Sequence, residues 1–352
     1  MKTTRGIEGP MVHAHILDIV GQTPMVRLDA EGLGNIEAYC KLEFSNPTGS
    51  VKDRAARYMV DRALASGEID EETLLVESSS GNFGIALAAL CARRNLKFCC
   101  VIDPRINPAN EMLIRSLGAQ VVRVEERDPT GGYLQTRLRK VRSILASNPN
   151  SYWTNQYANP INADAYYETL GAEICAALPR IDYAFVGVSS GGTITGVSRR
   201  LKQHFPDIRV VAVDAMGSVI FGGPPRTRWI PGIGASVVPE IVGRACIDDV
   251  VMVEETHAVQ ACHALWEKHA IFAGGSSGAT FSAMQNYFQG KTFSRPPVVV
   301  TVFADRGDRY AGTIFNPEWC DRLLRGTLQS AHHAVAENIA EHSNRGAHAL
   351  SQ

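Results

Sequence analysis

Short apolar runs alternate with helical stretches along most of this chain, and this rhythm is the feature that most restricts its fold. The runs are apolar at nearly every residue rather than at every second one, which is typical of strands buried on both faces of a parallel sheet. The sequence therefore predicts a doubly wound α/β fold in which helices cover both faces of parallel sheets. We expect strands at 73–77, 97–102, 120–124, 183–188, 209–214 and 297–303, and helices at 83–94, 108–117 and 133–145.

The composition argues against several other classes of protein. Of the 352 residues 45% are hydrophobic and 20% are charged, and 35 basic side chains stand against 36 acidic ones, for a net charge of −1. This balance, without a polybasic run, gives no reason to expect nucleic acid as a partner. Because no apolar run is long enough to span a bilayer and the N-terminus lacks a signal-peptide pattern, we expect a cytoplasmic protein without a membrane partner. The eight scattered cysteines show no metal-ligand spacing and predict reduced thiols and no metal site.

The segment 46–54, NPTGSVKDR, places Lys52 at the start of a predicted helix. The partial positive charge at a helix N-terminus disfavours a protonated amine, so Lys52 would lose its proton more easily than a free lysine. Imine formation and proton abstraction both require a neutral amine. Taken alone, Lys52 also fits a solvated position on the first turn of a helix.

Three loops rich in glycine and serine each open a predicted helix. SSSGNFG at 78–84 and GVSSGGTITG at 187–196 lie between a strand and a helix, where backbone N–H groups can bind a carboxylate or a phosphate. The second loop lacks both the Walker A lysine and the GxGxxG spacing of a dinucleotide site. GGSSGA at 274–279 places Ser276 where its hydroxyl could bond a neutral ring nitrogen. Ordinary helix capping also explains each loop when the loop is considered alone.

The order of these segments resembles the cysteine synthase family, the fold type II enzymes that use pyridoxal 5'-phosphate. NPTGSVKDR, SSSGNFG, NQYANP, GVSSGGTITG and GGSSGA follow one another as in that family, and the likeness runs from about Leu17 to about Tyr310. The resemblance implies two three-layer α/β domains with mostly parallel sheets, the cofactor between them, and a homodimer. It implies a large cofactor-binding domain (12–45 and 158–325), a smaller mobile domain (46–157) and a C-terminal tail (326–352).

The resemblance also implies roles for the matched residues. Lys52 would hold the cofactor as a Schiff base and serve as the catalytic base, and Asn82 would bond the ring hydroxyl of the cofactor. Ser276 matches the serine opposite the pyridine nitrogen, which leaves that nitrogen unprotonated and suits β-elimination and replacement. The cofactor phosphate would be bound by Ser189, Ser190, Gly191, Gly192 and Thr193, and the substrate α-carboxylate by Ser79, Ser80, Gly81, Asn82 and Gln156.

Several positions depart from the sulfide-using members of the family. Phe83, Tyr157 and the pair Ser189 and Ser190 add bulk or hydroxyl groups near the expected reacting carbon. The segments YWTNQYAN, PGIGAS and FADRGDRY are similar to a subgroup that joins O-phospho-L-serine to L-glutamate, a step towards 2,3-diaminopropionate for siderophores. We therefore expect these two substrates. The alternative is a cysteine synthase or cystathionine β-synthase reaction with a sulfur nucleophile.

These substrates make two demands on the side chains of the site. A leaving phosphate favours cationic partners, for which the candidates are Arg226, Arg228, Arg306 and Arg309. A second dicarboxylic amino acid also needs a cation or hydroxyl groups, for which the candidates are Arg137, Tyr157 and Ser189. Each arginine fits a surface or interdomain salt bridge as well.

Two hypotheses come from other classes of protein. A non-catalytic paralogue is disfavoured because Lys52, Asn82 and Ser276 are all present. A dinucleotide-dependent dehydrogenase is disfavoured because the glycines at 187–196 have the wrong spacing.

Overall fold

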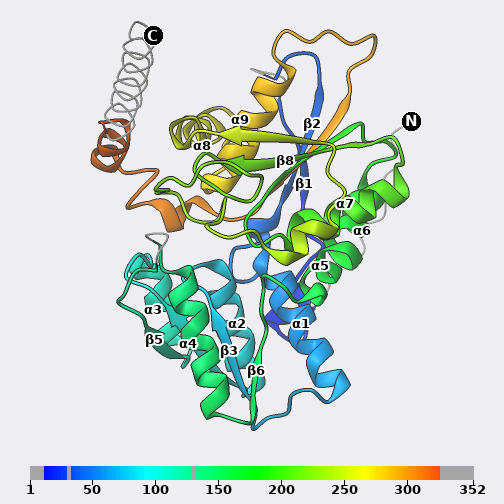
Figure 1. Ribbon diagram of the computed structural model, residues 1–352. Helices are drawn as coiled ribbons and strands as arrows, with labels where there is room; N and C mark the ends of the chain where they lie inside the picture. The colour runs from blue at the N-terminus through cyan, green and yellow to red at the C-terminus, as the bar shows by residue number, and fades with distance from the viewer. Residues whose placement is uncertain (1–11, 30–32, 129–131, 326–352) are drawn as a thin grey trace, which may run out of the picture.

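The computed structural model describes residues 12–29, 33–128 and 132–325, and its strands form two sheets (Figure 1). In the larger sheet only the first strand is antiparallel to its neighbour. The order of its strands is β1 (Met25–Arg27), β2 (Glu37–Leu42), β10 (Val298–Phe303), β7 (Tyr183–Gly187), β8 (Arg209–Ala215) and β9 (Asp249–Val253).

The smaller sheet is parallel throughout. Its strands lie in the order β5 (Gln120–Arg123), β4 (Lys97–Ile102), β3 (Leu74–Ser78) and β6 (Ser151–Trp153). The predicted α/β fold with mostly parallel sheets is confirmed, and each predicted strand agrees with the structure to within one residue at either end.

Helices surround both sheets, and Figure 1 shows the first four with the smaller sheet and the later ones with the larger. The first group is α1 (Lys52–Ser66), α2 (Asn82–Arg94), α3 (Pro108–Ser116) and α4 (Leu134–Ser147). The second group is α5 (Pro160–Tyr166), α6 (Ala172–Ala177), α7 (Gly192–His204), α8 (Glu255–His269) and α9 (Gly275–Phe288). Short turns complete the chain: η1 (Ile16–Ile19), η2 (Glu43–Ser45), η3 (Tyr167–Gly171), η4 (Glu240–Arg244) and η5 (Gly307–Tyr310).

The apolar core continues from one sheet to the other. Alternate residues of a strand face opposite sides, so Phe185 of β7 packs with α8 and α9, whereas Ala184 and Val186 pack towards α5 and α7. The latter cluster also contains Leu75 of β3 together with α1 and α2. A third cluster, which includes Val141 of α4, covers the other face of the smaller sheet. The helices between the two sheets therefore pack in one shared core, which brings the loops at the strand ends close to one another.

Local sequence signals explain where two of the helices begin. Asn107 and Asn159 each precede a proline, and each side-chain oxygen accepts a backbone N–H from the first turn of α3 or α5. Within the described ranges no helix is both long and apolar enough to cross a membrane. The predicted tail, 326–352, lies outside the described residues, and the predicted domain bounds stay a prediction.

Candidate active site

The loops singled out in the sequence meet near strand ends of both sheets. Val51, the residue before α1, donates its N–H to the carbonyl of Ala304, which directly follows β10 (2.8 Å). Asn82, the first residue of α2, donates its side-chain N–H to Asp305 (2.8 Å). These contacts bring Lys52, the smaller sheet's glycine loop and the end of the larger sheet's β10 together.

Lys52 is the first residue of α1 and is half-buried. Burial disfavours the charged amine and lowers the pKa of Lys52 to about 8, while the negative charge of Asp305 acts in the opposite direction. A lysine with this pKa is partly neutral near neutral pH. The neutral amine expected from the sequence is thus explained chiefly by burial, whereas the sequence argument relied on the helix N-terminus.

Asp305 is a buried carboxylate to which the sequence analysis gave no role. Its Oδ2 accepts hydrogen bonds from Asn82 (2.8 Å) and from the hydroxyl of Tyr310 (2.6 Å), and burial raises the pKa of Asp305. Arg309 donates to the side-chain oxygen of the same Asn82. Both ends of the Asn82 amide are therefore held, which fixes the direction of its remaining N–H. The only signal in the sequence was the position of Asp305 just past an apolar strand.

The loop between β7 and α7 has the geometry of an anion cradle. Gly191 has a φ of +92°, and a Cβ at Gly192 would lie 2.4 Å from the side-chain oxygen of Asn162. The hydroxyl of Ser190 is buried and has no hydrogen-bond partner within the described residues. Because an unpaired buried hydroxyl is costly, this atom indicates a missing ligand. A phosphate at the N-terminus of α7 fits both observations.

Three other residues predicted to contact the cofactor lie around this cradle. Ser189 donates its hydroxyl to the carbonyl of Gly234 (3.2 Å), and Thr193 is half-buried on the first turn of α7. Ser276 is buried on the first turn of α9, and its carbonyl lies 3.9 Å from the position that a Cβ would take at Gly187 of β7. The sequence-predicted phosphate loop and ring-nitrogen serine therefore lie on neighbouring elements.

The loop predicted to bind the substrate carboxylate is built around the first turn of α2. The hydroxyl of Ser79 accepts the N–H groups of Gly81 (3.4 Å) and Gly84 (3.0 Å), so it satisfies an N–H of the first turn of α2. Ser80 donates to Asp103 (3.0 Å) and accepts a bond from Arg137 (2.9 Å). Arg137 also forms an ion pair with Asp103 (3.2 Å) and is 12% exposed. The structure thus ties Arg137 to the carboxylate loop.

Gln156 and Tyr157 belong to a second loop, which a buried glutamate holds in place. Glu77 is fully buried; it accepts the Thr154 hydroxyl (2.6 Å) and the backbone N–H of Gln156 (3.2 Å), and burial raises its pKa. Asn162 donates to the carbonyl of Gln156 (2.7 Å) and so links this loop to the cradle. Sequence reasoning missed Glu77 and Asn162, because nothing in their local pattern distinguishes them from ordinary polar residues.

The four arginines considered for the leaving phosphate differ in their surroundings. Arg226 and Arg306 are exposed, and Arg306 pairs with Asp308 (3.4 Å). Arg309 is committed to Asn82 and to the carbonyl of Thr48. These three are therefore poorly placed to bind a leaving group.

Arg228 is the candidate with the most suitable surroundings. It is half-buried and donates to the hydroxyl of Ser236 (3.1 Å), and it forms no ion pair in the part of the chain that the structure describes. Burial raises the pKa of Tyr157, and the charges of Arg137 and Arg228 oppose that rise, so both guanidinium groups lie near this phenol. The charges of Arg137 and Arg228 thus act on the Tyr157 phenol, and these three residues are called the polar corner below.

Comparison with known proteins identifies the family. The sequence model of the family of pyridoxal-phosphate dependent enzymes matches residues 16–305 of this chain. The chain belongs to this family. It is a pyridoxal-phosphate dependent enzyme, and the cradle with its unpaired Ser190 hydroxyl fits the phosphate of that cofactor.

Relatives within the family include two proteins named N-(2-amino-2-carboxyethyl)-L-glutamate synthase. The protein of Ralstonia nicotianae is 45% identical over 94% of this chain and 97% of its own length. That of Cupriavidus metallidurans is 44% identical over 89% of this chain and 93% of its own. Among solved structures, the O-acetylserine-dependent cystathionine β-synthase of Helicobacter pylori has a TM-score of 0.81 and 32% identity, covering 86% of this chain and 99% of its own. The structure of an O-ureido-L-serine synthase has a TM-score of 0.81 and 31% identity, and the match covers 87% of this chain and 96% of that one.

The pKa of Lys52 leads to a prediction about cofactor uptake by the apoenzyme. Covalent attachment needs the neutral amine, so its rate is expected to rise as the pH increases through about 8, rather than near 10.5 as for an unburied lysine. In Asp305→Asn the negative charge that raises the pKa of Lys52 is gone, so the midpoint should move to lower pH. Stopped-flow absorbance of pyridoxal phosphate mixed with apoenzyme measures both profiles. A midpoint that stays unchanged in Asp305→Asn would show that the two groups do not interact.

Proposed function

We propose that this enzyme joins O-phospho-L-serine and L-glutamate by β-replacement, giving N-(2-amino-2-carboxyethyl)-L-glutamate and phosphate. The observation that carries the proposal is the alignment, over most of both chains, with two synthases named for this product. The product is a precursor for 2,3-diaminopropionate, and we place the enzyme at the first step of that route to a siderophore. We also propose that the enzyme is located in the cytoplasm.

Four parts of the site would hold the cofactor. Ser190 and the backbone N–H groups at the start of α7 would bind its phosphate, and Lys52 would bind its aldehyde carbon covalently. Asn82, whose amide is fixed by Asp305, would bond the ring hydroxyl. Ser276 would face the pyridine nitrogen. When bound, pyridoxal phosphate supplies an electron sink that stabilises negative charge at the substrate Cα.

Lys52 moves the proton in this reaction. The amine of phosphoserine would first take the place of Lys52 on the cofactor, which frees the Nζ of this lysine. That Nζ takes the Cα proton of phosphoserine, and the Cβ–O bond breaks as phosphate leaves. The glutamate amine then forms the new Cβ–N bond and loses a proton to the released phosphate, and Lys52 returns its proton to Cα. The loop of Ser79, Ser80 and Gly81, with Gln156, holds the α-carboxylate throughout.

The polar corner would bind the remaining anions. Arg228 forms no ion pair within the described residues, although the charges of Asp214 and Glu255 act on it, and it would receive the leaving phosphate. Arg137, Tyr157 and Ser189 would bind the carboxylates of glutamate. Sulfide has no carboxylate for these groups to bind, so their presence favours an amino acid as nucleophile.

The proposal also includes a domain movement and a dimeric state. We propose that residues 46–157 move as a unit and close on the substrate, since this segment carries the carboxylate loop. We also propose a homodimer. Ile16, Ile19 and Val26 expose between 38% and 57% of their surface near the edge strand β1, which suits contact with a second copy.

Product analysis tests the proposed reaction. The holoenzyme is incubated with O-phospho-L-serine and equal concentrations of L-glutamate, sulfide and L-homocysteine. The products are then separated and identified by mass spectrometry. The proposal predicts the glutamate adduct as the main product, with one phosphate released per adduct. If cysteine or cystathionine forms and no glutamate adduct appears, the sulfur-using alternative is correct.

A further inference from the structure

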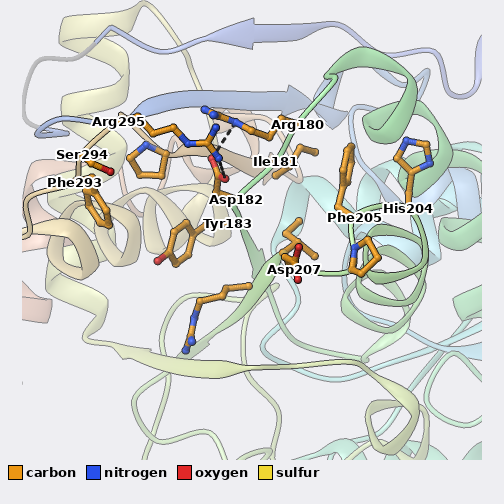
Figure 2. Close-up of a pocket in the computed structure, with 14 residues that line it drawn as sticks. Arg180, Ile181, Asp182, Tyr183, His204, Phe205, Asp207, Phe293, Ser294 and Arg295 are labelled. Carbon is orange, nitrogen blue, oxygen red and sulfur yellow. Dashed lines mark hydrogen bonds and ion pairs between the residues drawn. The ribbon is translucent and has the colours of Figure 1, made fainter.

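A second cavity, of about 540 Å³, lies at the opposite end of the larger sheet from the site described above (Figure 2). It is lined by the start of β7, the end of α7 and the loop that leads into β10. The cradle, by contrast, lies at the end of β7 and the start of α7. None of the residues lining the cavity has a role in the proposed reaction.

Arginines from three separate segments face this cavity. Arg180 and Arg295 share one carboxylate, that of Asp182, at 3.3 Å and 3.5 Å, and Figure 2 shows the three side chains together. Asp182 also accepts the N–H of Val298 (2.7 Å). The two ion pairs are longer than the roughly 2.7–2.9 Å of strong charge-assisted bonds. One carboxylate therefore serves two guanidinium groups, and both keep N–H donors for another acceptor.

The charge balance of the lining is positive. Arg209 is the third arginine, and its nearest carboxylate, that of Asp249, is 4.0 Å away. Besides Asp182, the one acidic residue of the lining is Asp207, so three arginines face two carboxylates. Arg209 is thus paired with Asp249, and an anion would be attracted chiefly to Arg180 and Arg295, which share the single carboxylate of Asp182.

The rest of the lining is partly apolar and partly polar, and its polar residues include His204 and Ser294. Phe293 and Tyr183 lie on one side of the arginine cluster and Phe205 on the other, as Figure 2 shows, and all three rings are only partly buried. Half-exposed aromatic faces next to guanidinium groups suit a ligand with a flat apolar body and an anionic group.

We propose that this cavity is a regulatory site for a small organic anion, an aromatic or similarly apolar body that carries a carboxylate or a phosphate. Strand β7 begins at the cavity and ends at the cradle, whereas helix α7 begins at the cradle and ends at the cavity. A ligand that shifts Tyr183 or His204 therefore acts on two rigid elements that also hold Ser190 and Gly192. Occupancy of the cavity then alters the affinity of the enzyme for O-phospho-L-serine.

Fluorine NMR of the holoenzyme tests the binding step. The probes are para-fluorobenzoate and para-fluorophenyl phosphate, with para-fluorobenzyl alcohol as the neutral counterpart. We expect saturable binding of at least one anionic probe and none of the alcohol, and the stronger anion identifies the ligand class. The variant Arg180→Gln/Arg295→Gln should weaken binding about tenfold or more. Arg139→Gln, which changes an exposed arginine on α4, should leave it unchanged.

The same samples test regulation. The KM for O-phospho-L-serine should change with the probe in wild type and in Arg139→Gln, but not in the double variant. The binding site is refuted if neither anion saturates or if the double variant binds as well as wild type. Specific binding without any change in KM refutes the regulatory role.

Discussion

Replacing Lys52 by alanine is expected to lower the rate of β-replacement by at least about 10⁴-fold, the largest effect of any single substitution in this chain. The change removes both the covalent attachment of the cofactor and the group that takes the Cα proton. The visible absorbance of the lysine-bound cofactor should disappear as well. Pyridoxal phosphate should still bind through the cradle at Ser190 and Gly192, because that loop does not depend on the lysine.

Lys97→Ala is the matched control. Lys97 lies in β4 with its side chain 54% exposed and pairs with Glu72 on the surface, so its removal should change neither absorbance nor rate. Absorbance spectra and steady-state rates of the two variants give the answer. Wild-type absorbance in Lys52→Ala would mean that another lysine holds the cofactor.

Arg54→Ala is expected to cost the largest amount of folding free energy, about 3–5 kcal/mol. Arg54 is buried two residues after Lys52 and contacts two glutamates, Glu43 at 2.6 Å and Glu173 at 2.6 Å. Lys41 reaches Glu173 from the other side (2.7 Å). Removing the guanidinium leaves the fully buried Glu43 without its cationic partner. Because the network ties α1 to η2 and α6, Lys52 should also lose its fixed position.

The network also predicts a pH dependence. Burial alone would raise the pKa of Glu173, but hydrogen bonds and charge from Arg54 lower it to about 2. A carboxyl group whose pKa is lower in the folded than in the unfolded protein stabilises the fold at pH values above its unfolded pKa, which is near 4.5 for Glu173. That stabilisation is lost as the pH falls towards 2. In Arg54→Ala this acid-dependent loss should be smaller than in wild type.

Urea unfolding of the apoenzyme at pH 7 and at acid pH measures both effects. Arg62→Ala serves as the control, because Arg62 lies on the same helix but is exposed, with its guanidinium over the ring of Tyr58. A loss below 1 kcal/mol in Arg54→Ala, similar to that expected for an exposed charge, would contradict the view that this network holds α1.

Much of the fold could be predicted because its signals are local. The strands 97–102 and 298–303 are apolar at almost every position, and helix α3 begins with an Asn-Pro pair. The short strand β6 and the buried network of Arg54 could not be predicted in the same way. Arg54 meets Glu173 across 119 positions of the chain, and no periodic pattern records a contact at that distance.

The residues of the site could be predicted where glycine and serine mark a loop. They could be predicted less well where contacts between residues distant in the sequence determine the role of a side chain. Gly191 and Gly192 show their conformational requirement in the sequence itself. Asp305 and Glu77 do not, because their importance lies in which side chains the fold brings to them. The same holds for Arg309, a leaving-group candidate in the sequence that the structure commits to Asn82.

Reduction of the holoenzyme with borohydride, followed by peptide mass spectrometry, tests the central assignment most directly. Borohydride makes the bond between cofactor and lysine permanent, so the modified peptide identifies the lysine. We predict one pyridoxyl group per chain, on the peptide that contains Lys52. Modification of a different lysine, or of none, would contradict the assignment of this site.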